Sequence, residues 1–119
     1  LVLEHLKDEK SSPQYQLQKY YPKIYASLKV KQFQLMQECV IKNLKNGIES
    51  GLYRENLDLE FISRIYFNGM IGIKDKDLFP LNNYSMKTLM NYYLEYHLRG
   101  ICTTQGLEIL TTFIQKNQL

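Results

Sequence analysis

The feature that most constrains the fold of this 119-residue chain is a long apolar repeat with a helical period, which begins at Lys23. Over roughly 30 residues, apolar side chains recur at three- and four-residue steps, and this spacing places them on one face of a helix. The set is Ile24, Leu28, Phe33, Leu35, Met36, Cys39, Val40, Leu44 and Ile48. A helix this long with a wide apolar face predicts a central helix that packs against several neighbours.

Shorter segments on both sides have the same period. Helices are predicted at about residues 1–10, 13–20, 58–73 and 85–101, and a terminal helix is predicted from Leu107. Asn56 or Asp58 is expected to cap one of them and Ser85 another, and Gly51 is expected to end the central helix in a left-handed conformation. Residues 74–83 form a loop that is long for a helical bundle. With six glycines and three prolines in the chain, the pattern predicts an all-α bundle of about six helices in a single domain, 1–119.

Composition narrows the function. The net charge of +3 is dispersed along the chain and does not indicate a nucleic-acid surface. Cys39 and Cys102 lie far apart without metal-ligand spacing, so both are expected to be packing residues, with redox sensing as a minor alternative for Cys102. No apolar run approaches the ~20 residues that span a bilayer, and no signal-peptide pattern is present, so a soluble, cytoplasmic protein without a membrane partner is expected.

Catalytic and cofactor motifs are also missing from the sequence. No acid and base, or nucleophile and base, have the spacing that would place them together on one element. There is no glycine-rich phosphate loop and no metal-binding motif. The sequence therefore predicts a protein that is not an enzyme and that holds no cofactor or metal.

Three stretches resemble one family. Residues 47–58, GIESGLYRENLD, are similar to the G-x-x-x-G-[LI]-[FY]-R-x-[DN]-[LIV]-[DN] junction that follows the central helix in TetR-like bacterial transcription regulators. Residues 98–106, LRGICTTQG, resemble the G-I-x-T-x-x-G stretch that closes the last dimerisation helix of that family. Residues 20–25, YYPKIY, resemble the start of the central helix in some members.

The resemblance implies the C-terminal ligand-binding and dimerisation domain of such a regulator. It implies a homodimer formed through a four-helix bundle and a cavity for a small-molecule effector. The family's N-terminal helix-turn-helix domain has no counterpart in this chain, which begins at Leu1 and is interpreted as a fragment. DNA binding is therefore expected only through the missing domain.

The cavity is expected to take a hydrophobic or amphipathic effector, because tyrosine and methionine suit an adaptable, partly polar pocket. The predicted ligand-binding residues are Met36, Cys39, Tyr66, Met70, Tyr93 and His97. Ordinary core packing is the alternative for each of them, and a satisfied, partly buried histidine is the alternative for His97.

The homodimer is expected to form through the helices at 58–73 and 85–101, because both have apolar side chains on more than one face. The predicted dimerisation residues are Ile62, Ile65, Gly69, Met86, Met90, Leu94 and Leu98. A compact monomer that buries these faces internally is the alternative. For the protein as a whole, the alternatives are a helical protein-interaction or structural bundle without a small-molecule site and, after it, an enzyme assembled across helices.

Overall fold

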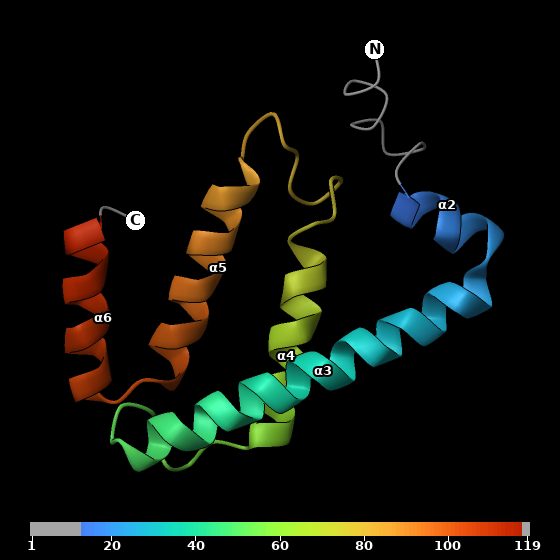
Figure 1. Cartoon of the computed structure of the whole chain (residues 1–119). Coiled ribbons are helices and arrows are strands. Elements are labelled where there is room, and N and C mark those ends of the chain that lie inside the picture. Colours follow the sequence, from blue (N-terminus) through green and yellow to red (C-terminus); the bar gives the residue numbers. More distant parts are fainter. Residues whose placement is uncertain (1–12, 118–119) are drawn as a thin grey trace. The chain divides into compact units, whose positions relative to one another are not determined.

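The structure is a computed structural model that describes residues 13–117. Within these residues it contains five helices and no strand, only an isolated β-bridge between Tyr53 and Cys102 (Figure 1). The helices are α2 (Pro13–Tyr20), α3 (Pro22–Glu49), α4 (Leu59–Gly72), α5 (Met86–Ile101) and α6 (Thr104–Asn117). The all-α prediction is confirmed, and the helix predicted at 1–10 lies outside the described residues.

The chain divides into two units, residues 1–35 and 36–119, and α3 belongs to both. In the described part of the first unit, α2 buries no side chain, and the Lys19 ammonium lies over the rings of Tyr15 and Tyr20. Pro22 begins α3, as expected of a residue that has no backbone N–H to offer a preceding turn.

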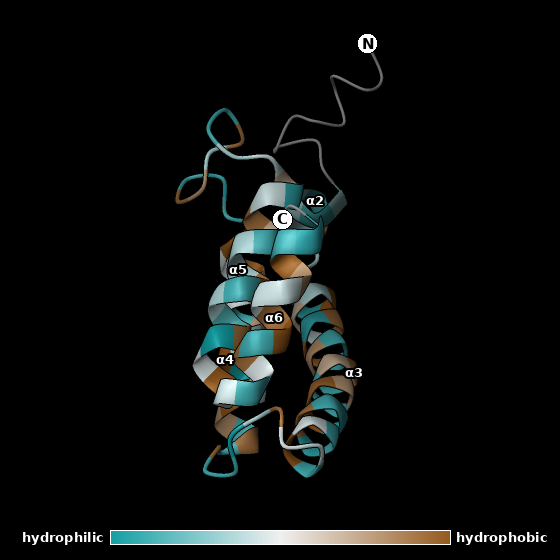
Figure 2. Ribbon diagram, turned by 90° about the vertical axis from the view of Figure 1, so that its left-hand side faces the viewer, coloured by the Kyte–Doolittle hydropathy of each residue, from teal (hydrophilic) through white to brown (hydrophobic). Residues whose placement is uncertain are grey.

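In the second unit, α4, α5 and α6 form one layer with alternating direction. Figure 1 shows the three helices beside one another, and Figure 2 shows them stacked one behind the next. Hydrogen bonds connect α3 to α4: the Gln37 amide donates to the Glu60 carboxylate and, over 3.3 Å, to the Ser63 hydroxyl. The second unit is therefore a three-helix layer with the C-terminal half of α3 bonded to α4.

The buried core of the described residues is small. Leu44, Ser63, Ile73, Leu89, Ile101 and Cys102 are buried. Leu44 comes from the predicted apolar face of the central helix, but Leu35 on that face is 67% exposed and Cys39 is also exposed. The expectation that Cys39 is a packing residue is therefore wrong for this chain, and much of the apolar surface is left uncovered.

Capping side chains set the helix ends. The Asp58 carboxylate accepts from the Phe61 N–H at 2.9 Å, and the Ser85 hydroxyl accepts from the Thr88 N–H at 3.1 Å. Gly51 follows α3 with φ of 76°, a conformation that costs glycine least. Of the two predicted caps for α4, the structure uses Asp58, and the predicted roles of Ser85 and Gly51 are confirmed.

One predicted boundary is wrong. α5 ends at Ile101 as predicted, but α6 begins at Thr104 rather than at Leu107. The difference arises because the Thr103 hydroxyl accepts from the Gly106 N–H at 3.1 Å, as an N-cap does. Residues 73–85 form hydrogen-bonded turns between α4 and α5, with the Phe79 and Tyr84 rings packed edge to face. No helix of the described part is long and apolar enough to cross a membrane.

Candidate functional site

The two stretches around residues 51–54 and 100–106 are hydrogen-bonded to each other, in what we call the interloop contact. The Arg54 N–H donates to the Ile101 carbonyl at 2.8 Å, and the Thr103 N–H donates to the Leu52 carbonyl at 2.9 Å. The Arg54 guanidinium also donates to the Gly100 carbonyl at 2.8 Å. Two segments about 50 residues apart in the sequence are thus hydrogen-bonded to each other at the N-terminal end of α6, which we call its base.

Side chains and glycines complete the interloop contact. The Thr103 hydroxyl lies 2.7 Å from the Gly51 carbonyl oxygen, to which it donates. A Cβ atom on Gly106 would lie only 2.1 Å from the Leu52 carbonyl oxygen, and one on Gly47 would lie 2.1 Å from the Tyr53 ring. Both glycines are therefore required by the close approach of neighbouring groups, and the position of α6 is set by backbone contacts at its first turn.

Tyr66, Tyr93 and His97 form an aromatic cluster between α4 and α5. The rings of Tyr66 and Tyr93 are stacked with centroids 5.5 Å apart, and the ring of His97 lies 4.5 Å from that of Tyr66. The Tyr93 hydroxyl donates to the Tyr66 carbonyl at 2.7 Å and lies 3.2 Å from the Ile65 carbonyl. It reaches the α4 backbone because Gly69 has no side chain: a Cβ there would lie 2.1 Å from the Tyr93 oxygen.

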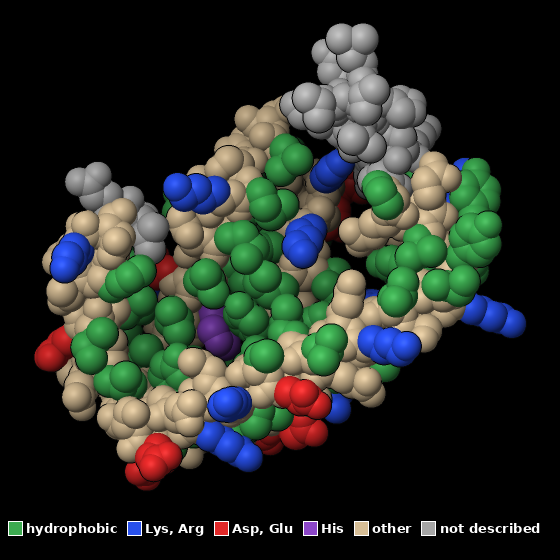
Figure 3. Space-filling model, viewed as in Figure 1, with side chains coloured by type: hydrophobic (Ala, Val, Ile, Leu, Met, Phe, Trp, Pro, Cys, Tyr) green, Lys and Arg blue, Asp and Glu red, His purple; other side chains and the backbone are tan. Residues whose placement is uncertain are grey.

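The aromatic cluster is uncharged at neutral pH. Burial, together with the neighbouring Tyr66 and Tyr96, raises the pKa of Tyr93 to about 12. Burial also raises the pKa of Tyr66 and lowers that of His97 below its ordinary value. Tyr66, Tyr93 and His97 are each half-buried, and Figure 3 shows hydrophobic side chains gathered on one face of the molecule. The cluster therefore presents a partly open, neutral and mostly apolar surface with a few polar atoms.

The structure brings together three of the six predicted ligand-binding residues, namely those of the aromatic cluster. Met36 and Met70 are half-buried and Cys39 is exposed. Cys102 is buried, and this burial raises the pKa of its thiol, with Arg99 acting in the opposite direction. A raised pKa reduces the thiolate fraction, which disfavours redox sensing by Cys102.

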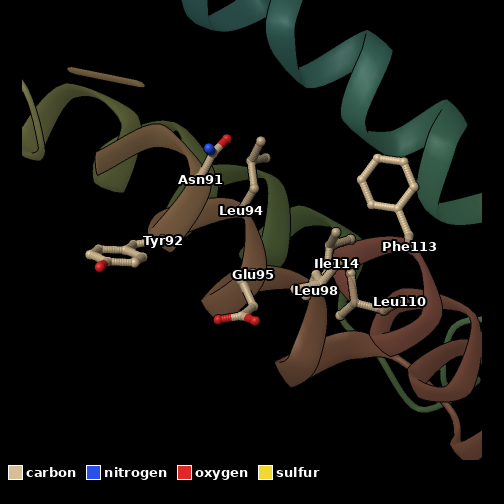
Figure 4. Close-up of a pocket in the computed structure, with 8 residues that line it drawn as sticks. All are labelled: Asn91, Tyr92, Leu94, Glu95, Leu98, Leu110, Phe113 and Ile114. Atoms are coloured by element: carbon tan, nitrogen blue, oxygen red, sulfur yellow. The ribbon is translucent and has the colours of Figure 1, made fainter. Parts of the chain in front are cut away.

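A groove lies between α5 and α6 (Figure 4). Its volume is about 140 Å³, and its lining residues are Asn91, Tyr92, Leu94, Glu95, Leu98, Leu110, Phe113 and Ile114. None of the six predicted ligand-binding residues lines it, whereas Leu94 and Leu98 had been predicted at the dimer interface. Sequence reasoning missed this groove because it depends on the distance between two helices.

Four large hydrophobic side chains form an exposed outer face on α4 and α5: Phe61 is 60% exposed, Ile65 46%, Tyr92 60% and Tyr96 79%. Phe61 and Ile65 lie two residues either side of Ser63, so they are on the opposite side of α4 from the α3 contact. Ile65, Tyr92 and Tyr96 each directly precede a residue of the aromatic cluster, so each is turned by about 100° around its helix from the contact between α4 and α5. Because the two helices run antiparallel (Figure 1), this turn brings the side chains on α4 and those on α5 to the same side of the layer.

Only some of the predicted dimerisation residues are exposed in the structure. Ile65, Met86 and Leu94 are exposed, whereas Ile62, Gly69, Met90 and Leu98 are half-buried within the chain. Gly69 contacts Tyr93 of its own chain. The exposure of Phe61, Tyr92 and Tyr96 was missed, since an apolar period alone does not distinguish an inner from an outer face.

Among the residues that the structure describes, no three His, Cys, Asp or Glu side chains gather as metal ligands. No protein-family model, curated protein or solved structure matches this chain.

Proposed function

We propose that this chain is the regulatory domain of a TetR-like bacterial transcription regulator, which forms a homodimer and binds a small hydrophobic or amphipathic effector. The observation that carries the proposal is the interloop contact. Two of the stretches that resemble the family, residues 47–58 and 98–106, were identified separately in the sequence, and they hydrogen-bond to each other.

Individual motif residues support the resemblance through their roles. Gly51 takes the left-handed conformation, Tyr53 packs on Gly47, and Asp58 caps α4. In the second stretch, Thr103 caps α6 and Gly106 allows the close approach of Leu52. The Thr103 hydroxyl bonded to the Gly51 carbonyl and the contact of Gly106 with Leu52 connect the two stretches across some 50 residues of sequence, which supports their interpretation as one motif-bearing junction.

The homodimer is supported by the outer face. Large exposed apolar side chains gathered on one side of two adjacent helices are typical of a protein interface. Two copies of the α4 and α5 pair, related by a two-fold axis, would bury this face in a four-helix bundle. Effector binding is supported by the uncharged aromatic cluster and by the groove between α5 and α6.

The proposal is tested with the full product of the gene that encodes this chain. We expect selection from random duplex DNA to yield a specific, palindromic operator, and a bound effector to change its affinity. The isolated 119-residue chain is the control, and it should bind DNA only weakly, with binding lost as salt rises. Failure of the full gene product to select any sequence would contradict the regulatory role.

A helical protein-interaction bundle is the second candidate. The outer face favours it, because such a face also suits a different partner protein. The groove does not separate the two candidates by its volume: about 140 Å³ is below the ~300–1,000 Å³ of common small-molecule sites, so it suits only an effector of the size of a single ring. A stable heteromeric complex that leaves the homodimer unformed would favour this candidate.

A further inference from the structure

We infer that the groove between α5 and α6 binds a benzene-sized apolar group that carries a positively charged amine. This inference rests on the proposed effector-binding function and deepens it. It names a site, the groove, that is separate from the aromatic cluster, and it names the chemical class of the ligand.

The groove exists because the base of α6 is held in place by backbone contacts. Only Cys102 and Thr103 separate α5 from α6, and Gly106 is already in contact with the Leu52 carbonyl. The Thr103 hydroxyl is bonded both to the Gly51 carbonyl and to the first turn of α6. α6 therefore cannot shift at its base to close the space, although close packing would otherwise favour closure.

The lining defines the apolar part of the ligand. Leu94 and Leu98 lie on the α5 side, and Leu110, Phe113 and Ile114 lie on the α6 side (Figure 4). The volume is about 140 Å³. An engineered protein cavity of ~150 Å³ with a similar leucine, isoleucine and phenylalanine lining binds benzene. A single aromatic ring therefore matches the groove in both size and chemistry.

The polar part of the ligand follows from the one charged residue among the lining side chains, Glu95. Its carboxylate lies 3.4 Å from the Arg99 guanidinium, and both side chains are partly exposed. Ion pairs of this kind are weak, so a ligand amine can share the carboxylate. Arg99 is not among the residues that line the groove, so the charged group that a ligand in the groove contacts is the Glu95 carboxylate, which favours a cation over an anion.

The test uses the whole 119-residue chain and NMR titration with two probes, benzylamine, which is protonated at neutral pH, and toluene. Benzylamine should shift the amide resonances of the groove-lining residues on both helices. Ile114→Trp should fill the groove and weaken benzylamine binding at least tenfold. Leu94→Trp, which blocks the groove from the other helix, should do the same if Ile114→Trp does not fold. The matched control is Ile109→Trp, because Ile109 is on α6, is 53% exposed and does not line the groove.

The charge is tested with Glu95→Gln, which should weaken benzylamine binding about threefold to fivefold and leave toluene binding unchanged. Equal loss for both probes would overturn the amine preference. Shifts confined to Tyr66, Tyr93 and His97 would overturn the groove site but leave effector binding by the chain intact. Resonances of Leu110, Phe113 and Ile114 that move with protein concentration in the absence of a probe would mean that a second copy covers the groove, and would overturn the inference. Tyr92 is left out of this comparison because it also belongs to the outer face.

Discussion

Replacing a glycine by alanine is expected to change the stability of this protein in opposite directions at different positions, depending on the atoms that surround each glycine. A Cβ atom on Gly69 would overlap the Tyr93 hydroxyl, whereas one on Gly72, three residues further along α4, would meet no atom within 4 Å. Alanine is a better helix former than glycine by ~1 kcal/mol. The same substitution is therefore expected to destabilise the protein at Gly69 and to be neutral or stabilising at Gly72.

Gly69→Ala should lower the free energy of unfolding by about 1–3 kcal/mol, because the added methyl group overpacks the contact with Tyr93. Tyr93→Phe should lower it by about 0.5–1.5 kcal/mol through loss of the hydroxyl's bonds to the α4 backbone. The double variant should lose less than the sum, because phenylalanine lacks the atom that the methyl group strikes first. Urea unfolding of the four proteins measures this coupling, with Gly72→Ala as the control, and strict additivity would contradict it.

His97 should make stability depend on pH. Burial lowers its pKa in the folded chain below the ordinary ~6.5, so the unfolded chain takes up its proton first as the pH falls. The contribution of His97 is complete above pH ~6.5 and declines as the pH falls toward the folded pKa. His97→Phe keeps an aromatic ring in the cluster and removes the titration. The difference in urea midpoint between wild type and His97→Phe should therefore change between pH 8 and pH 5, whereas a constant difference would contradict the assignment.

At the scale of elements, α6 depends on its first turn. Thr103 caps it, and Gly106 packs against the backbone of the segment that follows α3. The remaining length of α6 is separated from α5 by the groove. The helix should consequently come loose from the rest of the second unit when its base is disturbed.

Gly106→Ala should destabilise the attachment of α6 by about 3 kcal/mol, because the new methyl group would lie against a backbone oxygen that no side-chain rotation can move away. Hydrogen exchange should show faster exchange along α6, with α5 much less affected. Gly100→Ala is the matched control, since a Cβ there meets no atom within 4 Å. Equal exchange in the two variants would mean that the interloop contact does not hold α6.

At the scale of the whole molecule, the exposed apolar surface is the property that most affects whether two copies associate. The described residues bury few side chains, while the outer face leaves Phe61, Ile65, Tyr92 and Tyr96 in solvent. A second copy would remove this face from water, and the burial of apolar area is the main driving force for such association.

Tyr96→Asp should convert the proposed homodimer to a monomer without unfolding the chain, because Tyr96 is 79% exposed and a charge in the outer face would be desolvated on pairing. Sedimentation should give about twice the 14.2 kDa chain mass for wild type and a single chain mass for the variant. Thr112→Asp on the exposed surface of α6 is the control and should remain dimeric. A wild-type protein that stays monomeric at high concentration would remove the proposed interface.

The sequence by itself determined the helices, because period, capping residues and glycine positions act over a few residues. Asp58, Ser85 and Gly51 take the roles that their local chemistry predicts. The start of α6 was predicted too late in the sequence, because its N-cap, Thr103, lies in a polar stretch that is also typical of a loop between helices. Tertiary structure alone decided that Tyr93 reaches the backbone beside Gly69, that Arg54 and Thr103 join distant loops, and that a groove separates α5 from α6. These features depend on distances between elements far apart in the chain, and a one-dimensional apolar pattern contains no such distances.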